Sequence, residues 1–138
     1  MGGGALVERA RALYPDALLE DPPCVPGGAT VSWDARIRSA EDVARLPSRP
    51  AAVNVKPARL GSFRALLELY ETCSVEGIPV YGGGQHELGP GRRQIQLLAA
   101  LFHPDAPNDV APSAYNDAVP AADLPRSPLS VPNRPGIG

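Results

Sequence analysis

The stretch from Ala51 to Gly91, AAVNVKPARLGSFRALLELYETCSVEGIPVYGGGQHELGPG, decides the fold. Residues 51–56 form a short apolar segment that ends at Pro57, because proline has no N–H to donate to a sheet. Residues 63–76 have the apolar spacing of a helix with one buried face. That face comprises Phe63, Leu66, Leu67, Leu69, Tyr70 and Cys73. Residues 78–81 are apolar again, and the order strand, crossover helix, strand predicts two parallel strands whose C-terminal ends share one side of a sheet.

The rest of the chain continues this alternation. Further strands are predicted at 17–20 and 29–33, and residues 109–112 are a candidate start for a fifth strand. Helices are predicted at 5–13 and 92–102, the second with a buried face of Ile95, Leu98, Ala99 and Phe102. A brief helix should follow Ser39, with Ser39 as its N-terminal cap. Alternating strands and helices predict an α/β protein with about four to five parallel strands.

Length and composition exclude several classes of protein. The 138 residues suffice for one domain with a core. The 13 basic and 15 acidic residues give a net charge of −2, so we expect no nucleic-acid partner. No apolar run approaches the roughly 20 residues that span a membrane, and the N-terminus lacks signal-peptide features. Two cysteines, Cys24 and Cys73, predict no disulfide framework, which favours a cytoplasmic location.

Polar residues stand at the C-terminal ends of the predicted strands. Glu20, Asp34, Lys56 and Glu87 each lie at or just beyond such an end. A sheet that is buried on both faces has little use for ionisable groups there unless they converge on a site. Two carboxylates are oxygen ligands suited to Mg²⁺, and a lysine beside such a metal could act as a base.

Each of these residues also has a simpler interpretation. Glu20 could be a surface carboxylate before a Pro-Pro turn, Asp34 a cap for the following turn, and Lys56 an ordinary lysine at a strand end. Residues 82–84 are all glycine but lack the pattern of a phosphate loop. His86 and His103 are not expected to bind a ligand, and His103 should cap the end of its helix.

Several motifs, in order, resemble one family. LLEDPP (18–23), SWDARIRSAED (32–42), VNVKPARLGS (53–62), GIPVYGGGQHELGPGR (77–92) and HPDAPNDVAP (103–112) are similar to the C-terminal barrel half of the enolase superfamily. The resemblance points to its muconate-cycloisomerase and o-succinylbenzoate-synthase-like branch, and covers residues 5–118. It implies a partial (β/α)8 TIM-type barrel that uses Mg²⁺ and abstracts the proton α to a carboxylate, as a lyase, cycloisomerase or racemase.

The resemblance also assigns roles. Glu20 and Asp34 match metal ligands, Lys56 matches a catalytic lysine, and the loop with Gly83, Gly84, Gln85 and Glu87 matches one that contacts substrate. The capping domain, a third metal ligand and a second lysine have no counterpart, and the usual Asp-Glu-Ser is Asp34-Ala35-Arg36 here. Residues 21–33 also leave too little chain for a crossover helix.

We therefore expect half of an enzyme. Residues 1–118 should form the half-barrel and residues 119–138 a proline-rich extended tail. The chain should be inactive alone and should need the missing barrel half or self-association, and the complete enzyme should take a small carboxylate substrate. The alternative is a catalytically dead half-barrel, either a truncated chain or one that binds a partner such as another barrel half.

Overall fold

The computed structural model describes residues 3–25, 30–111, 117–119, 122–124, 126, 128–131 and 133. At its centre is a four-stranded sheet with the order β1-β2-β3-β4, in which all neighbouring strands are parallel. The strands are β1 (Leu19–Glu20), β2 (Val31–Trp33), β3 (Ala52–Val55) and β4 (Val80–Gly82). The predicted α/β class with parallel strands is confirmed.

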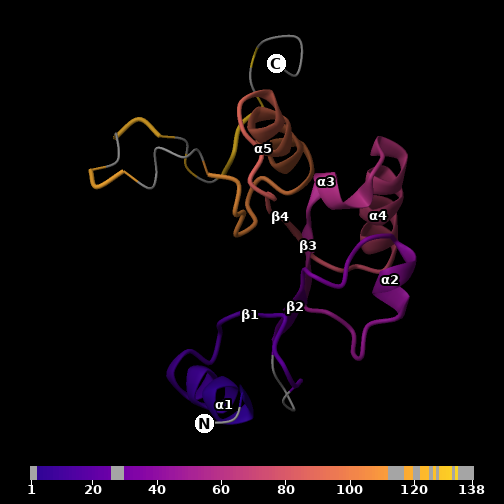
Figure 1. Ribbon diagram of the computed structural model, residues 1–138, viewed down its shortest axis with the longest axis vertical. Helices are drawn as coiled ribbons and strands as arrows, with labels where there is room; N and C mark the ends of the chain where they lie inside the picture. Colours follow the sequence, from indigo (N-terminus) through magenta and orange to yellow (C-terminus); the bar gives the residue numbers. More distant parts are fainter. Residues whose placement is uncertain are drawn as a thin grey trace.

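Five helices flank the sheet in the described residues: α1 (Gly3–Leu13), α2 (Glu41–Ala44), α3 (Pro57–Leu60), α4 (Phe63–Val75) and α5 (Pro90–Phe102). In Figure 1, α2, α3 and α4 lie together beside β2 and β3, whereas α1 and α5 lie at opposite ends of the sheet. The connection from β1 to β2 contains no helix in its described residues, 21–25 and 30, as its short length predicted. Residues 26–29 lie outside the described residues.

The main core lies between the sheet and α4. Val53 and Val55 alternate with Asn54 along β3, so they point to the helix side of the sheet and are almost fully buried. They belong to one cluster with Leu69 and Cys73 from α4. Burial raises the pKa of the Cys73 thiol to about 11, so this cysteine packs as a small apolar side chain, as predicted.

The predicted buried face of α4 was too wide. Phe63 is 64% exposed and Leu67 is 40% exposed, whereas Leu66 and Leu69 are buried. Residues 66, 69, 70 and 73 follow the i, i+3, i+4, i+7 spacing that turns one stripe toward the sheet. Phe63 and Leu67 project beside that stripe. The predictions that they are core residues were therefore wrong.

Two local features differ from the sequence prediction. Pro57 does not only end β3, because it also occupies the first turn of α3, where its missing N–H leaves no hydrogen bond unmade. Gly61 ends α3 with φ of 75°, a left-handed conformation that favours glycine. Ser39 does not cap α2 through its side chain. Instead, the Asp42 carboxylate accepts hydrogen bonds from the backbone N–H and the hydroxyl of Ser39.

The C-terminal part of the described chain departs from prediction in two places. Phe102 is 44% exposed rather than buried, and it stacks on Tyr70 with ring centroids 4.3 Å apart. Asp109 makes an isolated parallel bridge with Gly83 at the end of β4, where the fifth strand was predicted to begin, but residues 110–111 do not extend it. Pro112 and half of the predicted tail, 119–138, lie outside the described residues. Leu129 donates its backbone N–H to the Pro104 carbonyl oxygen. Its side chain packs against a second buried cluster, formed by Ile95, Ala99 and Val110.

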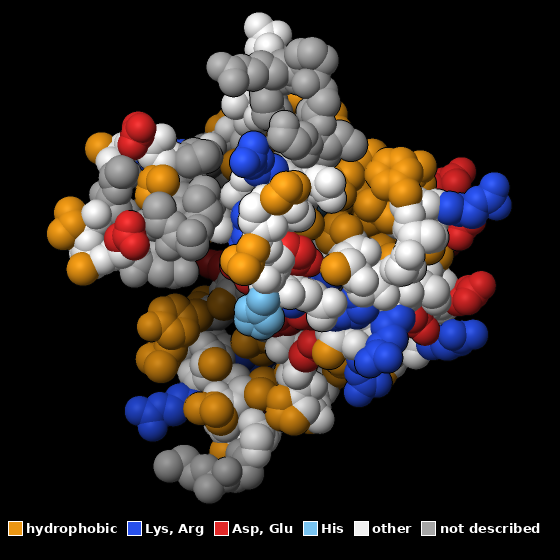
Figure 2. Space-filling model, turned by 45° about the horizontal axis from the view of Figure 1, so that its top comes forward, with side chains coloured by type: hydrophobic (Ala, Val, Ile, Leu, Met, Phe, Trp, Pro, Cys, Tyr) orange, Lys and Arg blue, Asp and Glu red, His pale blue; other side chains and the backbone are white. Residues whose placement is uncertain are grey.

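None of the described helices has the length and apolar composition needed to cross a bilayer. Figure 2 shows acidic and basic side chains mixed on the visible face, without a broad patch of one sign.

Candidate functional site

One face of the sheet carries a polar side chain from every strand. The register pairs Glu20 of β1 with Ser32 of β2, and Asn54 of β3 with Tyr81 of β4. The Tyr81 hydroxyl donates to Glu20 Oε2 and lies 3.1 Å from Ser32 Oγ. Asn54 Nδ2 donates to the same Glu20 oxygen at 3.0 Å. These contacts form a network of four side chains that connects all four strands.

The Tyr81 hydroxyl is held in its neutral form. Burial raises the pKa of Tyr81 above its ordinary value, and the hydrogen bond to Glu20 raises this pKa further. A protonated hydroxyl can donate to the carboxylate, whereas a phenolate would repel it. Ser32, Asn54 and Tyr81 are buried, whereas Glu20 is exposed, so the network joins three buried polar side chains to a carboxylate at the surface.

A second group of charged side chains lies two residues further along the strands. Asp34 follows β2 and Lys56 follows β3, and the two-residue period keeps them on the face that carries Ser32 and Asn54. Lys56 Nζ lies 2.6 Å from Asp34 Oδ2. Arg59 Nη1 lies 2.7 Å from Asp34 Oδ1 and also donates to the Asp34 carbonyl oxygen. One carboxylate therefore binds two cations.

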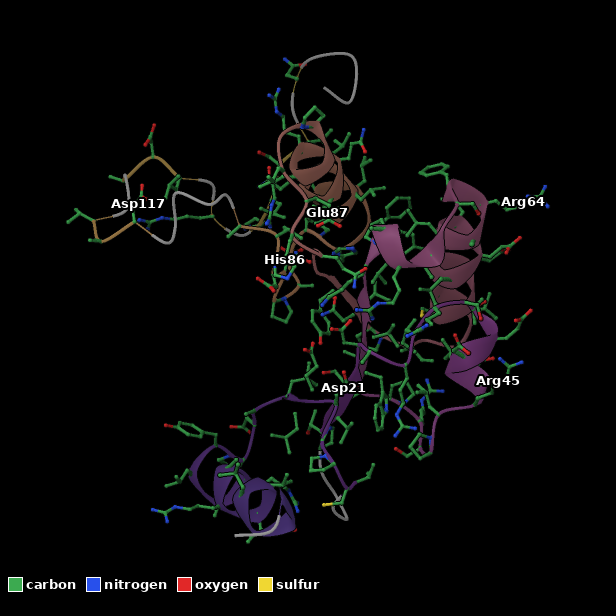
Figure 3. All side chains as sticks on the ribbon, in the orientation of Figure 1. Asp21, Arg45, Arg64, His86, Glu87 and Asp117 are labelled. Atoms are coloured by element: carbon green, nitrogen blue, oxygen red, sulfur yellow. The ribbon has the colours of Figure 1, made fainter. Side chains whose placement is uncertain are left out.

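The backbone after β2 is held from β1. Asp21, the residue after β1, has φ of 44°, and its carboxylate accepts hydrogen bonds from the N–H groups of Asp34 at 3.2 Å and Ala35 at 2.8 Å. Figure 3 places Asp21 beside the sheet, between α1 and the segments that follow β3. Asp21 therefore fixes the point at which Asp34 leaves the sheet.

The glycine-rich loop approaches this group from β4. A Cβ atom on Gly83 would lie 2.6 Å from Asn54 Oδ1 and 2.8 Å from Lys56 Cε, so a side chain there would displace both residues. The Glu87 carboxylate folds back to accept a hydrogen bond from the Gln85 N–H at 2.6 Å. Figure 3 shows His86 and Glu87 near the foot of α5. His86 is exposed, with φ of 66°.

Buried His103 is connected through Asn108 to Gly82, where the glycine-rich loop begins. His103 follows α5 as its C-terminal cap residue, as predicted. Asn108 Oδ1 accepts from Gly82 N–H at 2.7 Å and lies 2.7 Å from His103 Nδ1, so Nδ1 carries the hydrogen and Nε2 accepts from the Tyr70 hydroxyl at 3.0 Å. Burial lowers the pKa of His103. The histidine thus links α4, α5 and the end of β4.

The donor set does not fit a magnesium site in the described part of the chain. These residues contain no group of three or more histidine, cysteine, aspartate or glutamate side chains that could hold a metal ion. Both Asp34 oxygens are paired with cations, and Glu20 Oε2 accepts two hydrogen bonds. Asn54 Oδ1 is buried without a partner among the described residues, but one amide oxygen does not complete an octahedral set.

The structure thus joins some of the predicted site residues and separates others. Asp34 and Lys56 are in direct contact, and Gly83 lies against Lys56. Glu20 belongs to a different network, and the register places it beside Ser32 rather than Asp34. The roles predicted for Glu20, Asp34, Lys56, Gly83, Gly84, Gln85 and Glu87 stay predictions.

Sequence reasoning missed residues that make most of the contacts. These are Asp21, Ser32, Asn54, Arg59 and Tyr81. A signal for three of them was present, since Ser32, Asn54 and Tyr81 each stand two residues before a residue predicted for the site, and therefore on the same face of the sheet. Arg59 gave no such signal, because its position depends on the turn of α3.

Comparisons with known proteins agree with this architecture. The chain is 36% identical over 114 residues to o-succinylbenzoate synthase from Listeria innocua, which covers 78% of this chain and 30% of that protein. It is 34% identical over 104 residues to N-succinylamino acid racemase from Amycolatopsis, covering 73% of this chain and 28% of the racemase. The chain therefore spans less than a third of either relative.

A solved structure has the same arrangement. The crystal structure of an enolase-superfamily member from Listeria innocua matches with a TM-score of 0.57 and 28% identity, over 68% of this chain and 29% of that one. The fold and these similarities define an enolase-superfamily barrel segment of the o-succinylbenzoate-synthase-like kind, its C-terminal half. Within residues 4–117, the chain belongs to the family described as "Domain of unknown function (DUF8230) C-terminal domain".

Proposed function

We propose that this chain is the lysine-bearing half of an enzyme that moves a proton at the carbon next to a carboxylate, and that it is inactive alone. The observation that carries the proposal is the meeting of Asp34, Lys56 and Gly83 at one end of the parallel sheet, in the order of the motifs that resemble the enolase superfamily. In parallel barrel enzymes, that end of the strands carries the chemistry.

Lys56 is the acid/base group of the proposal. Its ammonium group is fixed by Asp34, and 15% of its side chain is exposed. Gly83 lies against its Cε, and an alanine at 83 would occupy space that the lysine needs. A side chain that is held by packing and an ion pair presents its nitrogen in one orientation, which proton transfer to a bound substrate requires.

The relatives suggest the class of substrate. Their names describe reactions that involve o-succinylbenzoate and N-succinylamino acids, and both compounds carry carboxylates. We propose a small carboxylate as substrate and a complementary barrel half, or a second copy of this chain, as partner. β1 supports the need for a partner, because it has one neighbouring strand in the described sheet and its other edge is unpaired there.

A specific observation favours a second candidate, a catalytically silent half-barrel that binds a partner. Asp34 is neutralised by two cations, and the described residues contain no three-carboxylate cluster. Such an arrangement can hold strands together without any reaction. The two candidates make opposite predictions for proton exchange.

Exchange of the α proton for deuterium separates the candidates. An N-succinylamino acid is incubated in D₂O with Mg²⁺ and the chain, alone or with the part of the Listeria innocua synthase that this chain does not match. We expect no exchange by the chain alone, and exchange after complementation that Lys56→Ala abolishes. Arg64→Ala is the matched control, because Arg64 lies on α4 and points away from the sheet in Figure 3.

Two outcomes would contradict the proposal. Exchange by the isolated chain that Lys56→Ala removes would show a complete active site. A folded complex that catalyses no exchange of the N-succinylamino acid would favour the silent half-barrel.

A further inference from the structure

We propose that, in the chain on its own, Lys56 and Arg59 together take the place of a divalent cation at Asp34, so that Asp34 and Glu20 serve as strand-linking groups and this chain without a complementary half excludes metal from the site. The inference goes beyond the proposed function and does not depend on catalysis. It concerns the two carboxylates that the sequence motifs assign to metal.

Charge and geometry at Asp34 support the exclusion. The carboxylate has two oxygens, and each is paired with a separate cation, at 2.6 Å and 2.7 Å. The two cations carry the same total charge as one Mg²⁺ ion. Only 10% of the Asp34 side chain is exposed, so solvent screens these charges little. A magnesium ion, which needs oxygen ligands at about 2.0–2.1 Å, would have to displace at least one cation.

Arg59 occupies its position because of the chain that precedes it. Pro57 starts α3 directly after β3, and one turn of helix brings Arg59 back over the end of β2. Its side chain is 14% exposed and donates to both the carboxylate and the carbonyl oxygen of Asp34. A guanidinium that binds side chain and backbone together is harder to displace than a single ion pair.

Glu20 has a comparable role with neutral partners. Its Oε2 accepts from Asn54 and from Tyr81, which belong to the two strands most distant from β1 in the sheet. The same hydroxyl lies 3.1 Å from Ser32. One glutamate oxygen thus holds β1 to β3 and β4. Moving this oxygen onto a metal would take the acceptor from the buried Asn54 amide and leave the Tyr81 hydroxyl with Ser32 Oγ alone.

Paramagnetic Mn²⁺ tests the inference, because it accepts the same oxygen ligands as Mg²⁺ and broadens nearby NMR signals. Amide spectra of the full chain are recorded with increasing MnCl₂ for the wild type, Arg59→Gln and the double variant Lys56→Met/Arg59→Met. Arg64→Gln, on the outer face of α4, is the control for loss of an arginine elsewhere. Resonances of Ser32 and Asp34 report on the site.

We expect no broadening of Ser32 or Asp34 beyond that of exposed residues in the wild type and in Arg64→Gln. Removal of both cations should strengthen Mn²⁺ binding at these residues by about tenfold or more, since the repulsion between like charges is lost. If the double variant does not fold, Arg59→Gln decides, because it keeps the Lys56 pair and frees one oxygen. Selective broadening in the wild type would overturn the inference, and so would folded variants that gain no binding.

Discussion

Removal of the Asp34 carboxylate is the most severe single change that the structure predicts. Asp34→Ala would leave two cations, Lys56 and Arg59, without their anion, and their side chains are only 15% and 14% exposed. Removing one partner of a buried ion pair typically costs about 3–5 kcal/mol, since the remaining charge stays desolvated. Small domains have a total unfolding free energy of only about 5–15 kcal/mol. The variant should therefore lose a large part of its stability.

Urea unfolding measures this loss, with fluorescence of the buried Trp33 as the signal. The matched control is Glu76→Ala, which removes a surface ion pair with Arg49 whose side chains are 62% and 58% exposed. Exposed pairs contribute about 0–1 kcal/mol, so this variant should unfold close to the wild type. A variant that lacks the anion and both cations, with Lys56→Met and Arg59→Met added to Asp34→Ala, should recover part of the lost stability.

The result that would refute this reasoning is specific. If Asp34→Ala and Glu76→Ala unfold within about 1 kcal/mol of each other, the two cations near Asp34 are solvated and the ion pairs stabilise little. If the triple variant is no more stable than Asp34→Ala, the loss comes from something other than unpaired charge.

Two further predictions concern pH and association. Burial lowers the pKa of His103 below 6.5, so the unfolded chain binds more protons than the folded chain near pH 6. The free energy of unfolding should therefore be highest above about pH 6.5 and should fall as the pH drops toward the pKa of the folded state. Thermal unfolding at several pH values should show this slope, and His103→Gln should reduce it; equal slopes would contradict the assignment. The unpaired edge of β1 in the described sheet should make the chain dimerise or aggregate, which light scattering after gel filtration can measure. A monomer with one cooperative thermal transition would argue against an open half-barrel.

Local patterns in the sequence were sufficient for the order of elements. Strand positions followed from short apolar runs between proline and glycine, and α4 and α5 followed from the helical spacing of apolar residues. The position of the polar residues at the strand ends could also be predicted, because parallel strands joined by right-handed crossovers end on one side of a sheet. Asp34 and Lys56 meet for that reason.

Contacts that depend on register and packing could not be predicted from the sequence. Arg59 reaches Asp34 only because α3 turns back over β2, and Tyr81 reaches Glu20 across three strand pairs. Phe63 and Leu67 fit a helical stripe, yet they are exposed because the sheet covers only part of α4.

The sequence by itself thus determined the class of fold and the polar residues at the C-terminal ends of the strands, since both depend on neighbours along the chain. Only the tertiary structure decided how those residues pair. Pairing depends on the distances between side chains from different strands, and these distances are set by register and by the packing of the helices. For that reason the sequence presented Glu20 and Asp34 as two metal ligands, whereas the fold gives each carboxylate its own protein partners.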